Sequence, residues 1–258
     1  PPLPPRGGGR ASSFTLAEND TWTRDVLTLA PGVQVRQEAT DWERALPFGL
    51  GAVVWDAALA FADLAEAWDA DGDGGGFWRG KTVLELGAGC GAAGLVLAAR
   101  GAEVTLTDRE ALLPLLHRNV DLNPSLAERV TVAALQWEEV EPAHFAAPDG
   151  RPFDIVLGTD VVDVDPDRRP GDPPFAALGQ ALGAMLIGAP RCFGLILFEE
   201  RGPLKLEALA EPFAALATQG ALWDFRPPER PRGAGANPMR CLCLHGPDGD
   251  APGGGFDA

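Results

Sequence analysis

The sequence contains no tyrosine, only four cysteines and only three histidines among its 258 residues. The cysteines are too few and too irregularly spaced for a zinc site or a disulfide framework, so we expect reduced thiols and no bound metal. No uninterrupted apolar run approaches the roughly 20 residues that a membrane helix needs. We therefore expect no membrane span and a cytoplasmic protein. The sequence begins with Pro1 and has no initiator methionine, which leaves targeting to an organelle open.

Basic residues are also scarce: 21 lysines and arginines stand against 37 aspartates and glutamates, which gives a formal net charge of −16 at pH 7. Because this charge repels a phosphate backbone, we do not expect a nucleic acid as partner. A basic protein or a small molecule fits better. With 46% apolar residues the chain can bury a large core, so its length predicts one α/β domain with an extension.

Composition divides the chain into four predicted parts. These are a disordered tail (1–13), an N-terminal extension (14–80), a core domain (81–246) and a second disordered tail (247–258). Both tails are rich in proline and glycine and cannot offset their ordering entropy by burial. Within the extension, apolar residues alternate on either side of Pro31-Gly32, which predicts a β-hairpin. Asp56 can cap a helix that runs to about Trp68.

Strands and helices alternate through the core domain. The predicted strands are 82–86, 103–107, 130–135, 154–157 and 193–198, and the predicted helices are 92–100, 110–122, 175–186 and 204–218. This alternation predicts a doubly wound, mostly parallel Rossmann-like sheet with helices on both faces. The apolar stretches 221–225 and 240–245 follow without a helical pattern between them. They predict a closing antiparallel hairpin at one edge, and so a seven-stranded sheet.

A glycine-rich turn follows the first strand of the core domain. Gly87, Gly89 and Gly91 let the backbone turn sharply and approach a ligand without obstruction by a Cβ atom. Glu85, near the end of that strand, can face a cationic group of the ligand. Asp108, at the end of the next strand, offers paired acceptors for both hydroxyls of a ribose. The turn and its carboxylates therefore predict a nucleoside cofactor, with S-adenosylmethionine as the leading candidate.

A nicotinamide or flavin dinucleotide is the alternative cofactor. Gly89, Gly91 and Gly94 also satisfy G-x-G-x-x-G, and Asp108 follows at a suitable distance. The carboxylate of Glu85, however, would repel a pyrophosphate, and a long stretch of chain precedes the first strand of the core domain. Both features favour the methyl donor S-adenosylmethionine over a dinucleotide.

Several motifs occur in the order found in one known group of enzymes. They are Gly49–Ala58, Val83–Gly91, Val104–Asp108, Asn119, Gln136-Trp137 and Asp154–Val162. With them the sequence resembles the seven-strand, class I methyltransferases of the protein-lysine methyltransferase-like type, often called family 16 methyltransferases. The resemblance extends from about Val33 to His245. It implies that residues 81–246 are a methyltransferase catalytic core that uses S-adenosylmethionine.

The resemblance also implies a set of cofactor-binding residues. They are Trp55 on the cofactor side of the cleft, Gly87, Ala88 and Gly89 along it, Asp108 at the ribose, Trp137 beside the adenine and Thr159 at the family's small-residue position. Glu85 joins this set from the argument about the turn. A flat tryptophan suits stacking on adenine, and the carboxyl ends of parallel strands form the crevice where ligands bind.

One position departs from the family pattern. The family usually carries an aromatic residue three positions after the acidic residue that follows the fourth strand, whereas Asp163 stands three positions after Asp160 here. An aromatic side chain would offer a cation–π wall to a substrate ammonium. Our hypothesis is that Asp160 anchors the incoming amine and that Asp163 assists it or replaces the missing aromatic. Both are predicted catalytic residues.

The leading functional prediction is methyl transfer to a lysine side chain of a protein substrate. A small molecule, a protein N-terminus or a histidine would use the same cofactor residues and stays an alternative acceptor. A third interpretation is a methyltransferase-like module that binds cofactor or a partner with little turnover, and Asp163 is its main support. The sequence predicts no particular oligomeric state.

Overall fold

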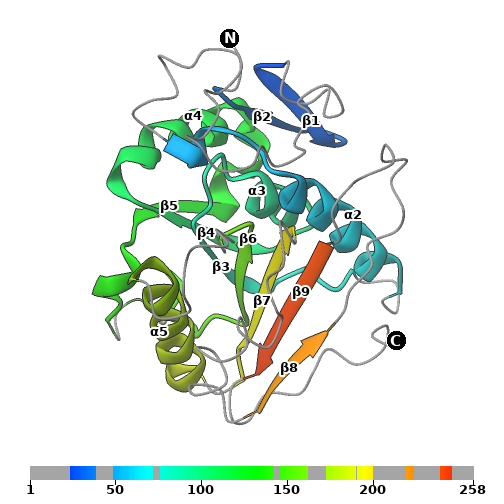
Figure 1. Ribbon diagram of the computed structural model, residues 1–258. Helices are drawn as coiled ribbons and strands as arrows, with labels where there is room; N and C mark the ends of the chain where they lie inside the picture. The colour runs from blue at the N-terminus through cyan, green and yellow to red at the C-terminus, as the bar shows by residue number, and fades with distance from the viewer. Residues whose placement is uncertain are drawn as a thin grey trace.

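The computed structural model describes residues 24–38, 49–71, 76–141, 144, 146–161, 173–189, 191–199, 219–223 and 239–245. The predicted tails 1–13 and 247–258, the predicted helix 204–218 and Asp163 lie outside these residues. Within them, the chain forms a seven-stranded sheet covered by helices and a separate two-stranded sheet (Figure 1).

The main sheet follows the doubly wound plan. Its strands are β3 (Thr82–Leu86), β4 (Glu103–Asp108), β5 (Val130–Ala134), β6 (Ile155–Thr159), β7 (Phe193–Glu199), β8 (Gln219–Trp223) and β9 (Met239–His245). Their order across the sheet is β5-β4-β3-β6-β7-β9-β8. Strands β3 to β7 pair in parallel, whereas β9 is antiparallel to both of its neighbours. The prediction of a mostly parallel sheet with an antiparallel strand inserted near one edge is therefore confirmed.

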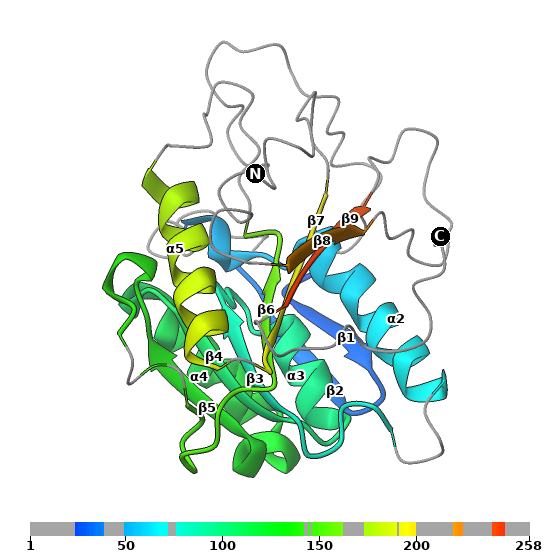
Figure 2. The ribbon, with the colours of Figure 1, turned by 90° about the horizontal axis from the view of Figure 1, so that it is seen from below.

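Helices cover both faces of this sheet. The α-helices are α2 (Asp56–Asp71), α3 (Ala92–Ala99), α4 (Leu113–Leu122) and α5 (Pro173–Gly188). The sheet has a hydrophobic core on each face, and alternate residues of β3 point into different cores. Val83 packs in the core with α2, α3 and α4. Leu84 and Leu86 pack in the core with α5. Figure 2 shows α5 and α2 on opposite sides of β6 and β7. All residues of β3 are buried, as expected for a parallel strand covered on both faces.

The N-terminal hairpin consists of β1 (Val26–Ala30) and β2 (Val33–Arg36), joined about Pro31-Gly32 as predicted. Gly32 has a φ of 77°, a backbone conformation that favours glycine in such a turn. Val33 and Val35 are fully buried in the core that also contains α2, α3 and α4. The hairpin is thus packed on the main domain through one of its faces.

Several element boundaries differ from the sequence-based expectation. The predicted helix 110–122 is a short 3-10 helix, η4 (Glu110–Leu112), followed by α4. Pro114 lies in the first turn of α4, and because proline has no N–H it cannot bond to a carbonyl of the preceding turn. The predicted strand 221–225 is β8, which begins and ends two residues earlier.

The described residues contain neither a membrane helix nor a metal cluster. No helix among them is long and apolar enough to span a bilayer. In the same stretches, no group of three His, Cys, Asp or Glu side chains is arranged to hold a metal ion. All four cysteines are free and buried, and burial raises the pKa of the Cys192 thiol to about 12. Such thiols are unreactive, as structural cysteines are.

Candidate functional site

The turn between β3 and α3 depends on glycine. Its glycines with left-handed backbone are Gly87, Gly89 and Gly91, with φ of 64°, 56° and 75°. Residues that carry a Cβ rarely adopt this conformation. A Cβ on Gly87 would lie 2.8 Å from a methyl carbon of Val161, and one on Gly89 would lie 3.1 Å from the carbonyl oxygen of Gly51. Other segments therefore approach the bare backbone of the turn closely.

Asp108 ends β4 beside this turn. One carboxylate oxygen accepts a hydrogen bond from the N–H of Gly89 (2.8 Å), and the other accepts one from the N–H of Arg109 (2.8 Å). The N–H of Ala88 donates to the carbonyl of Thr107, so the turn and the strand end are joined twice. Burial raises the pKa of Asp108 above its ordinary value, and the two hydrogen bonds and the Arg109 charge oppose that rise. Each oxygen keeps further acceptor capacity, which a pair of hydroxyl groups can use.

Glu85 lies beneath the first turn of α3. Its carboxylate accepts a hydrogen bond from the N–H of Gly94 at 2.9 Å, and the residue is 1% exposed. A Cβ at position 94 would lie 2.5 Å from that oxygen, so glycine makes room for the carboxylate. Burial raises the pKa of Glu85 to about 8; the Gly94 hydrogen bond opposes this shift, and the charge of Asp108 adds to it. The side chain braces the start of the helix, and its contact with a cationic ligand group stays a prediction.

The short 3-10 helix η3 (Gly49–Ala52) packs against the glycine turn. The carbonyl of Gly51, which faces Gly89, also accepts a hydrogen bond from the thiol of Cys90 at 3.4 Å. Trp55 follows η3 and is half-buried, and its indole N–H donates to the carbonyl of Leu50 at 2.9 Å. The indole is therefore fixed to η3, and η3 is fixed to the turn.

Trp137 lies just after β5, at the start of the 3-10 helix η6 (Trp137–Glu139). Its side chain is half-buried, and its Cζ2 atom would lie 3.3 Å from a Cβ on Gly87. A depression of about 420 Å³ opens nearby, lined mainly by residues 109–111 after β4 and residues 134–136 at the end of β5. This volume is in the usual range for small-molecule sites. Its lining includes Arg109 and Gln136 but none of the predicted cofactor residues, so the depression adjoins the predicted site without forming it.

Thr159 and Asp160 lie at the carboxyl end of β6, which pairs with β3 and β7. Asp160 has a φ of 56°, and in the described part of the chain no other non-glycine residue has a positive φ. Its N–H donates to the carbonyl of Leu197 at 2.7 Å, and its carboxylate accepts a hydrogen bond from the N–H of Glu199 at 3.3 Å. Aspartate tolerates this conformation better than most residues. Strand β7 therefore holds a strained backbone at a predicted catalytic position.

The structure brings most of the predicted site to one edge of the sheet. The glycine turn, Asp108, Trp137 and the Thr159-Asp160 strand end all lie at or just beyond the carboxyl ends of β3 to β6. Val161, which fills the space in front of Gly87, was not predicted. A valine after a strand resembles any other apolar residue, so the sequence carried no signal for it.

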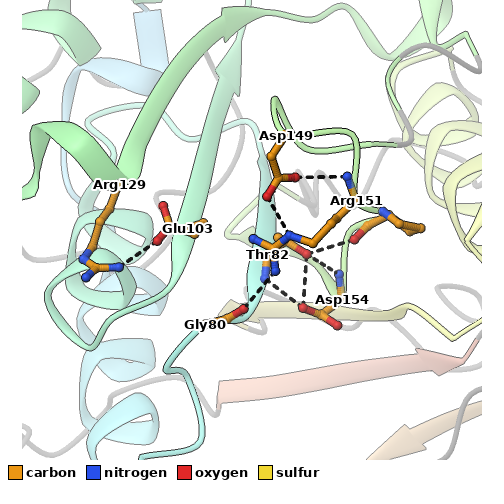
Figure 3. A network of polar contacts seen from close by, with 8 residues as sticks. Gly80, Thr82, Glu103, Arg129, Asp149, Arg151 and Asp154 are labelled. Carbon is orange, nitrogen blue, oxygen red and sulfur yellow. Dashed lines mark hydrogen bonds and ion pairs between the residues drawn. The ribbon is translucent and has the colours of Figure 1, made fainter.

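A second polar cluster lies at the opposite, amino-terminal edge of the sheet (Figure 3). Thr82 begins β3, and its N–H and hydroxyl donate to the carboxylate of Asp154 at 2.8 and 3.1 Å. Arg151 donates to Asp149 at 2.6 Å and to the carbonyl of Gly80 at 3.4 Å. Doubly wound sheets bind ligands at the carboxyl ends of their strands. We therefore interpret this second cluster as structural.

Comparison with known proteins gives partial matches in sequence. EEF1A lysine methyltransferase 3 from Mus musculus is 38% identical over 92 residues, which are 34% of this chain and 36% of that protein. The protein N-lysine methyltransferase METTL21A from Danio rerio is 43% identical over 86 residues, which are 33% of this chain and 38% of that protein. The matched stretch thus spans little more than a third of the length of these curated relatives.

Solved structures match most of the chain in fold. Magnesium protoporphyrin IX methyltransferase from Synechocystis PCC 6803 with bound SAM has a TM-score of 0.51 at 14% identity, covering 81% of this chain and 92% of that one. Its complex with SAH has a TM-score of 0.52 at 15% identity, covering 80% and 94%. At such low identity this likeness shows the fold alone.

A family model shows to which protein family the chain belongs. The model, described as lysine methyltransferase, matches residues 36–166, which make up half of the chain. This range contains η3, the glycine turn, Asp108, Trp137 and Asp160. The chain therefore belongs to the lysine methyltransferase family.

Proposed function

We propose that this protein is an S-adenosylmethionine-dependent methyltransferase that methylates a lysine side chain of a protein substrate. Membership of the lysine methyltransferase family supports this reaction, and one similar relative is named a protein N-lysine methyltransferase. The observation that carries the proposal is the carboxylate of Asp108, which is hydrogen-bonded to Gly89 in the glycine turn. Paired acceptors held beside such a turn suit a ribose diol.

In this proposal the donor lies across the glycine turn, with its ribose at Asp108. Trp137 borders the adenine, and the side chains of Trp55 and Thr159 line the remaining cleft. The absence of a Cβ on Gly87 lets Trp137 lie close to the turn, because a side chain there would meet Trp137 and Val161. The donor supplies an electrophilic methyl group on a sulfonium, and the protein supplies orientation and removal of water.

The acceptor amine needs a lone pair directed at that methyl group. A lysine with a reference pKa of about 10.4 is protonated at neutral pH and must lose a proton before it reacts. We propose that Asp160 anchors the incoming ammonium as an ion pair and that Asp163 assists it. The hydrogen bond from the Glu199 N–H to Asp160 supports this role, because it fixes one oxygen of the carboxylate.

Charge and thiol chemistry support a particular kind of partner and location. The formal net charge of −16 favours a basic, lysine-bearing protein as substrate and disfavours a nucleic acid. Four free, buried cysteines agree with a reducing compartment. We therefore propose a cytoplasmic enzyme with a protein substrate.

The substitution Asp160→Asn tests the proposed anchor. Asparagine keeps an oxygen that can accept the Glu199 N–H, and it tolerates a left-handed backbone, but it carries no charge. We expect nearly unchanged donor affinity in calorimetry and a methyl-transfer rate at least about 100-fold lower, the loss expected when a reacting group is misplaced. Asp160→Ala, which also removes the hydrogen bond, is the comparison variant. Full transfer by Asp160→Asn would overturn the assignment.

Isotopically labelled S-adenosylmethionine and a cell extract test the reaction itself. After incubation with the unchanged protein, mass spectrometry should find labelled lysine in a protein. Label confined to small molecules, to a protein N-terminus or to histidine would support the alternative acceptors. Donor binding without any label would support a binding module, and no donor binding would refute the whole proposal.

A further inference from the structure

Two buried asparagines face the N-terminal hairpin: Asn119 in α4, and Asn123, which follows the last residue of that helix. Asn119 is 0% exposed, and Asn123, the C-cap residue of α4 four positions later, is 2% exposed. A buried amide that lacks hydrogen bonds costs considerable free energy. The hydrogen-bond partners of these two amides therefore indicate the structural role of each side chain.

The two side chains together bind the backbone of β2 as a neighbouring strand would. The amide oxygen of Asn119 accepts the N–H of Arg36 at 2.8 Å, and its amide nitrogen donates to the carbonyl of the same residue at 2.9 Å. Asn123 binds Gln34 in the same way, at 2.8 and 2.6 Å. Since Gln34 and Arg36 are two residues apart, these bonds follow the spacing of a β-ladder on the edge of β2 away from β1.

The two asparagines differ in where the second amide hydrogen goes. In Asn123 it donates to the backbone carbonyl of Asn119, at 2.7 Å, in α4. In Asn119 it donates to the carbonyl of Cys90, also at 2.7 Å, within the glycine turn. Asn119 thus joins the hairpin, α4 and the turn, whereas Asn123 joins only the hairpin and α4.

The carbonyl of Cys90 lies at a sensitive point of the turn. Gly89, one residue before it, donates its N–H to Asp108. Gly91, one residue after it, caps α3 with a φ of 75°, and its N–H donates to the carbonyl of Ala88 at 2.7 Å. A rotation of the peptide between Cys90 and Gly91 would therefore move both the Asp108 contact and the start of α3.

We propose that Asn119 is a positioning residue of the methyl-donor site: through the carbonyl of Cys90 it fixes the glycine turn and couples the hairpin to donor affinity. This inference rests on the proposed donor site. The hairpin then belongs functionally to the cofactor site, although β1 and β2 contribute no predicted cofactor residue. Binding of the donor and docking of the hairpin should strengthen each other, because coupling between two sites is reciprocal.

The matched variants Asn119→Ala and Asn123→Ala test this proposal. Both lose two hydrogen bonds to the hairpin, so both should lower the midpoint of thermal unfolding. Only Asn119→Ala should raise the dissociation constant of S-adenosylmethionine, by roughly 10-fold, the order expected for the loss of one buried hydrogen bond. Asn123→Ala should change it by less than about twofold. Equal effects of both variants, or no effect of Asn119→Ala, would overturn the proposal.

Amide hydrogen exchange on the unchanged protein provides a second test. This test does not need a folded Asn119→Ala variant. Saturating S-adenosylmethionine should slow exchange at the N–H of Arg36, the donor to Asn119, by at least about fivefold. Unchanged exchange at Arg36 in the donor complex would overturn the coupling. If calorimetry finds no donor binding to the unchanged protein, the proposed function fails instead, so the two failures can be told apart.

Discussion

The two edges of the main sheet carry different kinds of polar structure. At the amino-terminal edge, acidic and basic side chains meet in pairs, as in the 2.7 Å contact between Arg129 and Glu103 (Figure 3). At the carboxyl-terminal edge, Glu85 and Asp108 are held mainly by backbone N–H groups. At the first edge Glu103 and Asp149 are paired with arginines, whereas the second edge holds carboxylates beside a turn of small residues.

The same two edges shift carboxyl pKa values in opposite directions. Hydrogen bonds from the backbone and side chain of Arg151 lower the pKa of Asp149. Burial raises the pKa of Asp108 and raises that of Glu85 to about 8. Carboxyl groups with raised pKa values in a crevice are typical of functional sites. The difference between the edges agrees with the proposal that the donor binds at the carboxyl-terminal edge.

The largest expected effect concerns Asp108. Asp108→Ala should weaken S-adenosylmethionine binding at least about 100-fold in calorimetry, because two hydrogen bonds to a charged acceptor each contribute about 1.5 kcal/mol. Asp149→Asn, at the amino-terminal edge, should leave the affinity unchanged. If both variants weakened binding equally, the functional contrast between the two edges would be lost.

The next expected effect, on stability instead of affinity, concerns the titration of Glu85. The folded state holds the proton up to about pH 8, whereas the unfolded chain releases it near 4.5. Because the folded state binds more protons between these values, its stability is fully present below about pH 4.5 and falls as pH rises toward 8, by at most roughly 1.4 kcal/mol per pH unit. Glu85→Gln should remove this part of the slope in urea unfolding at pH 5, 6.5 and 8.

The control for this titration is Glu103→Gln at the amino-terminal edge, which should keep the wild-type slope. A wild-type protein that is equally stable at pH 5 and pH 8 would contradict the assignment of a buried, protonated Glu85.

The smallest expected effect concerns Arg129. The side chains of Arg129 and Glu103 are 44% and 38% exposed, and ion pairs with such exposure contribute less than about 1 kcal/mol. Arg129→Ala should therefore lower stability only slightly in thermal unfolding, and added salt should reduce the difference. A loss above about 2 kcal/mol would mean that the amino-terminal edge has a larger part in stability than its exposed pairs suggest.

The plan of the sheet followed from the sequence because local patterns determine it. Each parallel strand is a short apolar run between turn residues, and Pro31-Gly32 supplies the backbone that a hairpin needs. The sequence also predicted that the glycine turn and Asp108 lie close together, since β3 and β4 are adjacent and parallel. Asp108 and the turn could be predicted because both lie at strand ends.

Other features depend on contacts between distant parts of the chain. The left-handed backbone of Asp160 is fixed by the carbonyl of Leu197 in another strand, which no local pattern reveals. Gly94 satisfies the last glycine of a dinucleotide motif, yet in the structure it makes room for the carboxylate of Glu85. Its role depends on which face of β3 is covered by α3, and strand alternation alone does not decide that.

The inserted strand β9 sets an order of events during synthesis. It lies between β7 and β8 although it follows both in the sequence, and it pairs with all seven residues of β7 from Phe193 to Glu199. Until residues 239–245 have left the ribosome, β7 has one edge without a neighbouring strand. An open edge of this kind can pair with other chains, so the arrival of β9 removes a site of mispairing.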